Sequence, residues 1–158
     1  MRLSPRSGGR PRPVNITYAL SLPAEAASVP TARLICRANL ELLQVARSSI
    51  DDVTLALTEA CANVVQHAGG RRYQVRVAIE DDCCQIDVLD EGGGFDPAEV
   101  GEPDPEALLP SGRGLLLIES VVDKLAFTRR EGVAGTVLSL EKRLELDPGS
   151  PLAVPSVT

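Results

Sequence analysis

Apolar and polar residues recur along most of the chain with a regular period, and that period predicts the first three elements. Residues 14–22 alternate with the period of two that a half-buried strand shows. A helix is expected over 28–45, with Ser28 as its N-cap and Pro30 in its first turn. A second helix is expected over 51–67, opened by acids that suit the helix dipole and followed by two glycines.

The pattern then returns to strands. Strands are expected over 73–80 and 85–90, joined by a tight turn, and a long loop rich in Gly and Pro follows to residue 113. A further helix should begin at Gly114 and continue through residue 125, before a hairpin over 126–144. This order predicts an α+β two-layer sandwich in which helices cover one face of a mixed, mostly antiparallel sheet.

Length and composition indicate one domain. The chain has 158 residues, 44% of them hydrophobic and 24% charged. We expect a single folded domain over 13–146, a disordered basic tail over 1–12 and a flexible tail over 147–158. Apolar runs fall well short of the ~20 residues of a membrane span, and no signal-peptide core follows the basic N-terminus, so the expected location is the cytoplasm, away from membranes.

Charge, aromatic content and cysteine spacing argue against nucleic acid and zinc as ligands. The net charge is −6, aromatic residues make up 3% and Trp is absent, so direct nucleic-acid binding is not expected. The four cysteines show no C-x-x-C spacing and the chain has one His, which argues against zinc. They are interpreted as reduced, small apolar residues, and a redox role for Cys83 and Cys84 stays open.

Two glycine-rich segments are candidates for ligand contact. Asp90, Gly92 and Gly94 form a D-x-G-x-G segment at a strand end, which suits either a ligand amine or a flexible turn. Gly112 and Gly114 flank Arg113 at a helix start, which suits either an anion or a simple N-cap. The chain has neither a Walker-type GxxxxGK motif nor a GxGxxG motif that opens a helix.

The second predicted helix carries polar residues at the border of its apolar face. Glu59 and Asn63 lie one turn apart, with Asp52 in the same sector, and offer a possible base and a possible metal-binding oxygen. A solvated helix edge is the alternative. His67 is interpreted as a helix-end residue rather than a catalytic one, and no Ser-His-Asp pattern is evident.

Taken in order, these motifs resemble the GHKL ATPase fold shared by gyrase B, heat-shock protein 90, histidine kinases and MutL. The similarity covers about residues 50–142. Within that superfamily, residues 58–68 (TEACANVVQHA) and 112–118 (GRGLLLI) resemble the bacterial anti-sigma-factor serine/threonine kinases, which are single domains of this type.

The resemblance implies a role for each motif residue. Glu59 would be the general base, Asn63 the Mg²⁺ ligand and Asp90 the residue that binds the adenine amino group. Residues 95–111 would form the ATP lid. The remaining expected ATP-binding residues are Gly92, Gly94, Gly112, Arg113, Gly114, Leu115 and Thr136. For Arg113 the expectation rests on its charge and place rather than on the family.

The function implied is an ATP- and Mg²⁺-dependent serine/threonine protein kinase. It would phosphorylate an anti-anti-sigma factor, sequester a sigma factor and form a homodimer. Two alternatives remain: a nucleotide-binding partner-switch module that transfers no phosphate, and the catalytic domain of a histidine kinase. The second is disfavoured because the chain has no separate helix with a phospho-accepting His.

Overall fold

The computed structural model describes residues 14–67, 71–90, 113–129 and 136–153. Strands and helices occur in the order that the sequence predicts, with a short 3-10 helix, η1, before the first α-helix. The elements are β1 (Asn15–Pro23), η1 (Ala26–Ser28), α1 (Val29–Leu42), α2 (Arg47–His67), β2 (Arg72–Glu80), β3 (Cys83–Asp90), α3 (Arg113–Val121), β4 (Lys124–Arg129) and β5 (Thr136–Arg143).

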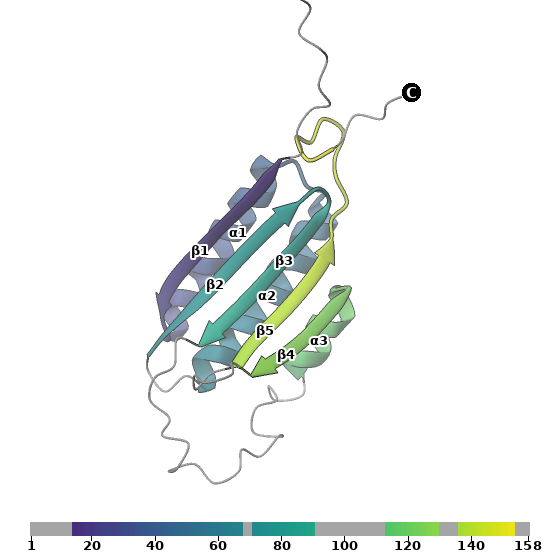
Figure 1. Cartoon of the computed structure of the whole chain (residues 1–158). Coiled ribbons are helices and arrows are strands. Elements are labelled where there is room, and N and C mark those ends of the chain that lie inside the picture. Colours follow the sequence, from purple (N-terminus) through teal and green to yellow (C-terminus); the bar gives the residue numbers. More distant parts are fainter. Residues whose placement is uncertain (1–13, 68–70, 91–112, 130–135, 154–158) are drawn as a thin grey trace, which may run out of the picture.

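The five strands form one sheet in the order β1-β2-β3-β5-β4, and the three α-helices cover one of its faces (Figure 1). This confirms the α+β sandwich. The expected parallel component is absent from the described strands, because every pair is antiparallel. The crossover through α3 gives β4 the same direction as β3, but β5 lies between these two strands and separates them.

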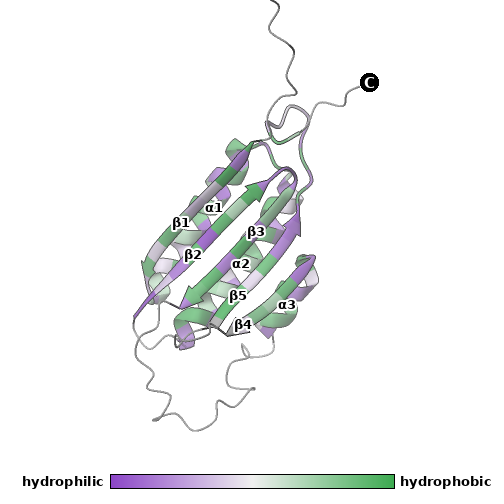
Figure 2. Ribbon diagram, viewed as in Figure 1, coloured by the Kyte–Doolittle hydropathy of each residue, from purple (hydrophilic) through white to green (hydrophobic). Residues whose placement is uncertain are grey.

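The core lies between the sheet and the helices. Strands β2 and β3 bury alternate residues on the helix side, and the opposite residues are more exposed, as the alternation of colours along these strands in Figure 2 reflects. Tyr73, at 0% exposure, is the largest fully buried side chain. Three cysteines, Cys36, Cys61 and Cys84, are buried here, and all four cysteines are free, as expected.

The helix ends differ from those predicted. Helix α2 begins at Arg47 instead of residue 51, and its first turn contains no acidic residue. Ser28 occupies the N-cap position of α1 but makes no capping bond, because its Oγ donates to the Glu25 carbonyl and also bonds Tyr73. Helix α3 ends at Val121, and β4 begins at Lys124, where the helix was expected to continue.

The expected flexible tail from residue 147 is in part folded. Ser150 and Leu152 are buried, and the Ser150 Oγ donates to the Leu43 carbonyl at 2.6 Å. Gly149 has a φ of 89°, a conformation that glycine adopts without strain. The folded domain therefore continues beyond residue 146, because this segment covers the junction between α1 and α2. The predicted tail over 1–12 lies outside the described residues.

None of the described helices is long and apolar enough to cross a membrane.

Candidate nucleotide-binding site

Helix α2 places Asn63 in the interior. The residue is 8% exposed, and its Oδ1 atom is buried and accepts no hydrogen bond from the described residues. Buried polar atoms are nearly always paired, and leaving one unpaired costs about 1–3 kcal/mol. An amide oxygen that is buried without a hydrogen-bond partner is suited to bind a ligand.

Glu59 lies one helical turn before Asn63 and is partly exposed. Within the described residues its carboxylate forms neither an ion pair nor a hydrogen bond. Asp52, on the same sector of α2, differs because its Oδ2 lies 3.2 Å from the Lys142 Nζ on β5. The structure thus gives the Asp52 carboxylate a partner on the sheet, whereas the Glu59 carboxylate has none within the described residues.

Lys142 is a residue that the sequence analysis did not identify. It lies on the helix side of β5, and its side chain is 18% exposed. A Lys near the end of an alternating strand gives no local signal of its partner, since Asp52 is ninety positions earlier in the chain.

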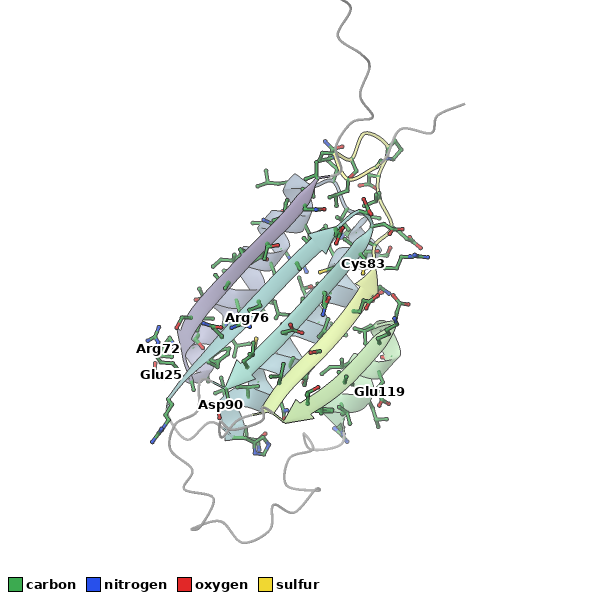
Figure 3. All side chains as sticks on the ribbon, in the orientation of Figure 1. Glu25, Arg72, Arg76, Cys83, Asp90 and Glu119 are labelled. Atoms are coloured by element: carbon green, nitrogen blue, oxygen red, sulfur yellow. The ribbon has the colours of Figure 1, made fainter. Side chains whose placement is uncertain are left out.

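Asp90 is the last residue of β3 and is partly buried. It pairs with Tyr73 of β2, and its neighbour Leu89 pairs with Val137 near the start of β5. Figure 3 shows Asp90 at the end of the sheet to which β3 points. A carboxylate in this place can accept a hydrogen bond from an amine.

The remaining described motif residues start elements at the same end of the sheet. Arg113 is exposed at the first position of α3, with Gly114 and Leu115 partly buried after it, and Thr136 is the first residue of β5. The last turns of α2, the end of β3, the start of α3 and the start of β5 lie together in Figure 1. The fold therefore brings motifs from four separate segments to one place.

Gly92, Gly94 and Gly112, as well as the expected lid over 95–111, lie outside the described residues. His67 is the last residue of α2 and is exposed, which agrees with its interpretation as a helix-end residue.

The donor set at this end of the sheet fits a magnesium nucleotide. A carboxamide oxygen is a hard ligand of the kind that Mg²⁺ binds, and Mg²⁺ is commonly held by one or two protein oxygens together with substrate phosphates. No group of three or more His, Cys, Asp or Glu side chains in the described part of the chain could cage a metal by itself. The Asn63 oxygen, which has no partner among the described residues, would be one such protein ligand.

Comparisons with known proteins show which family this chain resembles. Residues 22–142 match the model of the histidine kinase-like ATPase domain family. The serine-protein kinase RsbW of Halalkalibacterium halodurans is 30% identical over 142 residues, which cover 83% of this chain and 85% of the relative. The serine-protein kinase RsbW of a Bacillus cereus strain is 27% identical over 147 residues, which cover 85% of this chain and 91% of the relative.

A solved structure has the same fold. The crystal structure of the RsbU and RsbW domains of a Mycobacterium tuberculosis protein matches 82% of this chain with a TM-score of 0.61 and 22% identity. The match spans 32% of that longer chain. The matched family model, the similar kinases and the shared fold together show that the chain belongs to the histidine kinase-like ATPase family, within its group of anti-sigma-factor serine kinases.

Proposed function

We propose that the protein is an ATP- and Mg²⁺-dependent serine/threonine protein kinase that also acts as an anti-sigma factor. The observation that carries the proposal is the pair on α2, where the buried Oδ1 of Asn63 lies one turn from the carboxylate of Glu59 and neither group has a partner among the described residues. Phosphoryl transfer depends mainly on positioning and charge neutralisation, and this pair offers a metal-binding oxygen beside a base.

Each motif residue has a part in this proposal. Asn63 would hold the Mg²⁺ that neutralises phosphate charge, and Asp90 would accept a hydrogen bond from the adenine amino group. The free N–H groups at the start of α3 and the Arg113 guanidinium would bind the phosphates. Glu59 would accept the proton of the incoming Ser or Thr hydroxyl. The residues proposed to shape the pocket are Gly92, Gly94, Gly112, Gly114, Leu115 and Thr136.

The proposed partners follow from the family. The acceptor would be an anti-anti-sigma factor, and the unphosphorylated acceptor would compete with a sigma factor for the kinase. The protein would act in the cytoplasm as a homodimer. Support comes from the similar proteins that are named serine-protein kinases.

The nucleotide site is tested by calorimetric titration of ATP with and without Mg²⁺. Asn63→Ala is expected to remove the Mg²⁺ dependence, and Asp90→Asn to weaken binding at least tenfold. Asn39→Ala is a matched control, because the Asn39 Oδ1 on α1 is also buried without a partner in the described structure, but lies on another helix. Equal losses in both Asn variants would point to general destabilisation and contradict the assignment.

The catalytic step is tested with Glu59→Ala. This variant should bind ATP normally but lose transfer of labelled γ-phosphate to anti-anti-sigma proteins of the same organism by at least 100-fold. Glu41→Ala, an exposed carboxylate on α1, is the control and should retain transfer. ATP binding with no transfer by the wild-type protein, while a sigma factor is still sequestered, would favour the non-catalytic partner-switch module.

A further inference from the structure

The three α-helices leave one face of the sheet open (Figure 1), and this open face has a hollow where β2 turns into β3. The hollow has a volume of about 290 Å³. Its lining residues are Ala78, Glu80, Asp81, Asp82, Cys83, Gln85 and Arg143. Figure 3 shows Cys83 at the end of the sheet opposite to Asp90. The hollow is therefore separate from the proposed nucleotide site.

The hollow carries negative charge that the described residues neutralise only in part. Glu80 and Asp81 form its acidic rim. Both are exposed, and neither carboxylate forms an ion pair or a hydrogen bond within the described part of the chain. Asp82 has a partner, since its Oδ2 lies 3.5 Å from the Arg143 Nε. Three acids thus line the hollow with one cation, so the hollow attracts positively charged groups.

The chain enters β1 beside this hollow. Asn15 pairs with Glu80 and Thr17 pairs with Ala78, so the start of β1 borders the lining residues of β2. Residues 1–13, which the structure does not describe, precede this point in the chain. A segment of this length can span up to ~40 Å, whereas the distance across the sheet from β1 to β5 is about 14 Å. The segment is therefore long enough to cross the hollow.

The composition of residues 1–13 is complementary to the charge of the hollow. The segment contains no acidic residue and four arginines, which are Arg2, Arg6, Arg10 and Arg12. A guanidinium group binds carboxylates through directed hydrogen bonds as well as through charge. Because Arg10 and Arg12 lie only a few residues before β1, they are the arginines that the chain holds nearest to the acidic rim.

We propose that residues 1–13 bind back over the open face of the sheet, with Arg10 and Arg12 paired to the acidic rim. Attachment to β1 gives the segment a high effective concentration at this surface, so ion pairs that are individually weak suffice to hold it. The bound segment excludes basic segments of other proteins from the hollow. This contact goes beyond the proposed function, since it needs neither nucleotide nor phosphoryl transfer.

A nitroxide spin label on the segment tests this placement in the full chain without ATP. The label is attached to Ser7→Cys in a Cys83→Ser background, in which the three remaining cysteines are buried. The amide NMR signals of Ala78 and Gln85 should then fall to less than half of their unlabelled intensity. The signal of Arg72, about 20 Å farther along β2, should change little.

The dependence on charge is measured with the same label. Arg10→Glu/Arg12→Glu should reduce the loss of signal at least threefold, because like charges then meet at the acidic rim. Salt at about 0.5 M should have a similar effect, since it shortens the Debye length to about 4 Å.

Charge reversal on the sheet tests whether the hollow itself is the contact. Glu80→Arg/Gln85→Arg should weaken the contact of the unchanged segment and restore that of the segment with reversed charge. Glu119→Arg/Ser120→Arg is the matched control, because it makes the same change in charge at two exposed positions of α3. The control pair should have neither effect.

Four outcomes would overturn the proposal. They are unchanged Ala78 and Gln85 signals, a loss of signal that survives the reversal of the two arginines, restoration by the control pair, and a loss of signal that arises between molecules. The last is measured by mixing spin-labelled chains with isotope-labelled chains that carry no spin label, and it would place the segment on another molecule. Circular dichroism shows that each variant is folded, and ATP binding by the same variants tests the proposed function separately.

Discussion

Two buried polar side chains differ in whether their buried oxygen atom has a hydrogen-bond partner. The Tyr73 hydroxyl is paired at 2.9 Å with the Ser28 Oγ and so fixes the start of α1 to β2. The Asn63 Oδ1 is buried to a similar degree but has no partner in the described residues. The first atom stabilises the fold, whereas the second carries an energetic cost that a ligand can offset.

We expect Tyr73→Phe to lower the free energy of unfolding by about 1 kcal/mol, because it removes one buried hydrogen bond. Urea unfolding measures the change. Tyr18→Phe is the matched control and should cost less, since the Tyr18 hydroxyl lies beside the Cys36 thiol, a weak partner, and forms no hydrogen bond of ordinary geometry in the described structure. Equal losses in both variants would refute a specific role for the Ser28 contact.

Cys83 is the cysteine nearest to solvent, and its environment protects it. Partial burial, together with a hydrogen bond from its Sγ to Glu141 Oε1 at 3.4 Å, raises the pKa of the thiol to about 11. At pH 8 the reactive thiolate should be about 100-fold rarer than for an ordinary thiol, so we expect iodoacetamide to label Cys83 slowly. Glu141→Gln should speed labelling. Mass spectrometry after timed alkylation gives both rates, and rapid labelling of the wild type would support a redox role instead.

At the scale of elements, the connections between helices and strands decide where each element ends. Helix α1 closes with Gln44 at a φ of 52°, and the Val45 N–H donates to the Leu40 carbonyl in the manner of a Schellman motif. The segment after β5 then crosses this corner, where the Ala46 N–H donates to the Glu145 carbonyl at 2.7 Å. The corner between α1 and α2 therefore depends on the C-terminal segment.

Leu152→Ala should lower the free energy of unfolding by about 2–3 kcal/mol, because Leu152 is 3% exposed and its truncation leaves a cavity at this corner. Leu116→Ala on α3 makes the same chemical change at a residue that is 65% exposed, and should cost less than about 0.5 kcal/mol. Thermal or urea unfolding compares the two. A loss at Leu152 as small as that at Leu116 would mean that this segment does not stabilise the domain.

At the scale of the whole molecule, several weakly acidic groups are buried together in the core. Burial raises the pKa of Cys36 to about 11 and that of Cys61 to about 12, and it also raises the pKa values of Cys84 and Tyr18. These groups stay protonated in the folded protein at pH values where they ionise in the unfolded chain. The stability that these protonated groups contribute is fully present below the pKa that they have in the unfolded chain, and it falls as the pH rises above that value.

We therefore expect the free energy of unfolding to decrease steadily above about pH 9, the ordinary pKa of a cysteine. Each buried thiol contributes up to about 1.4 kcal/mol per pH unit between its unfolded and folded pKa values. Urea unfolding between pH 7 and pH 10.5 in the presence of a reductant measures the slope. Cys61→Ala should make the slope shallower, and an unchanged slope in that variant would contradict the assignment to buried thiols.

The sequence by itself determined the elements, because hydrophobic periodicity is a local property that side-chain burial imposes on each strand and helix. It also determined the spacing of the proposed motif residues, since Glu59 and Asn63 lie one helical turn apart in any helix. Helix starts were less predictable. The pattern predicts that the second helix begins at residue 51, whereas α2 begins at Arg47. In its first turn the Ser49 Oγ accepts a hydrogen bond from the Glu145 N–H at 2.8 Å, a contact that no local pattern shows.

Only the tertiary structure decided which ends of the elements meet. Strand order brings Asp90, the start of α3 and the start of β5 to the last turns of α2, and it places the start of β1 beside the turn between β2 and β3. The burial of the Asn63 oxygen and the separate roles of Asp52 and Glu59 arise in the same way. The physical reason is that periodicity records whether a side chain is buried, whereas its partners depend on packing between segments that are distant in the chain.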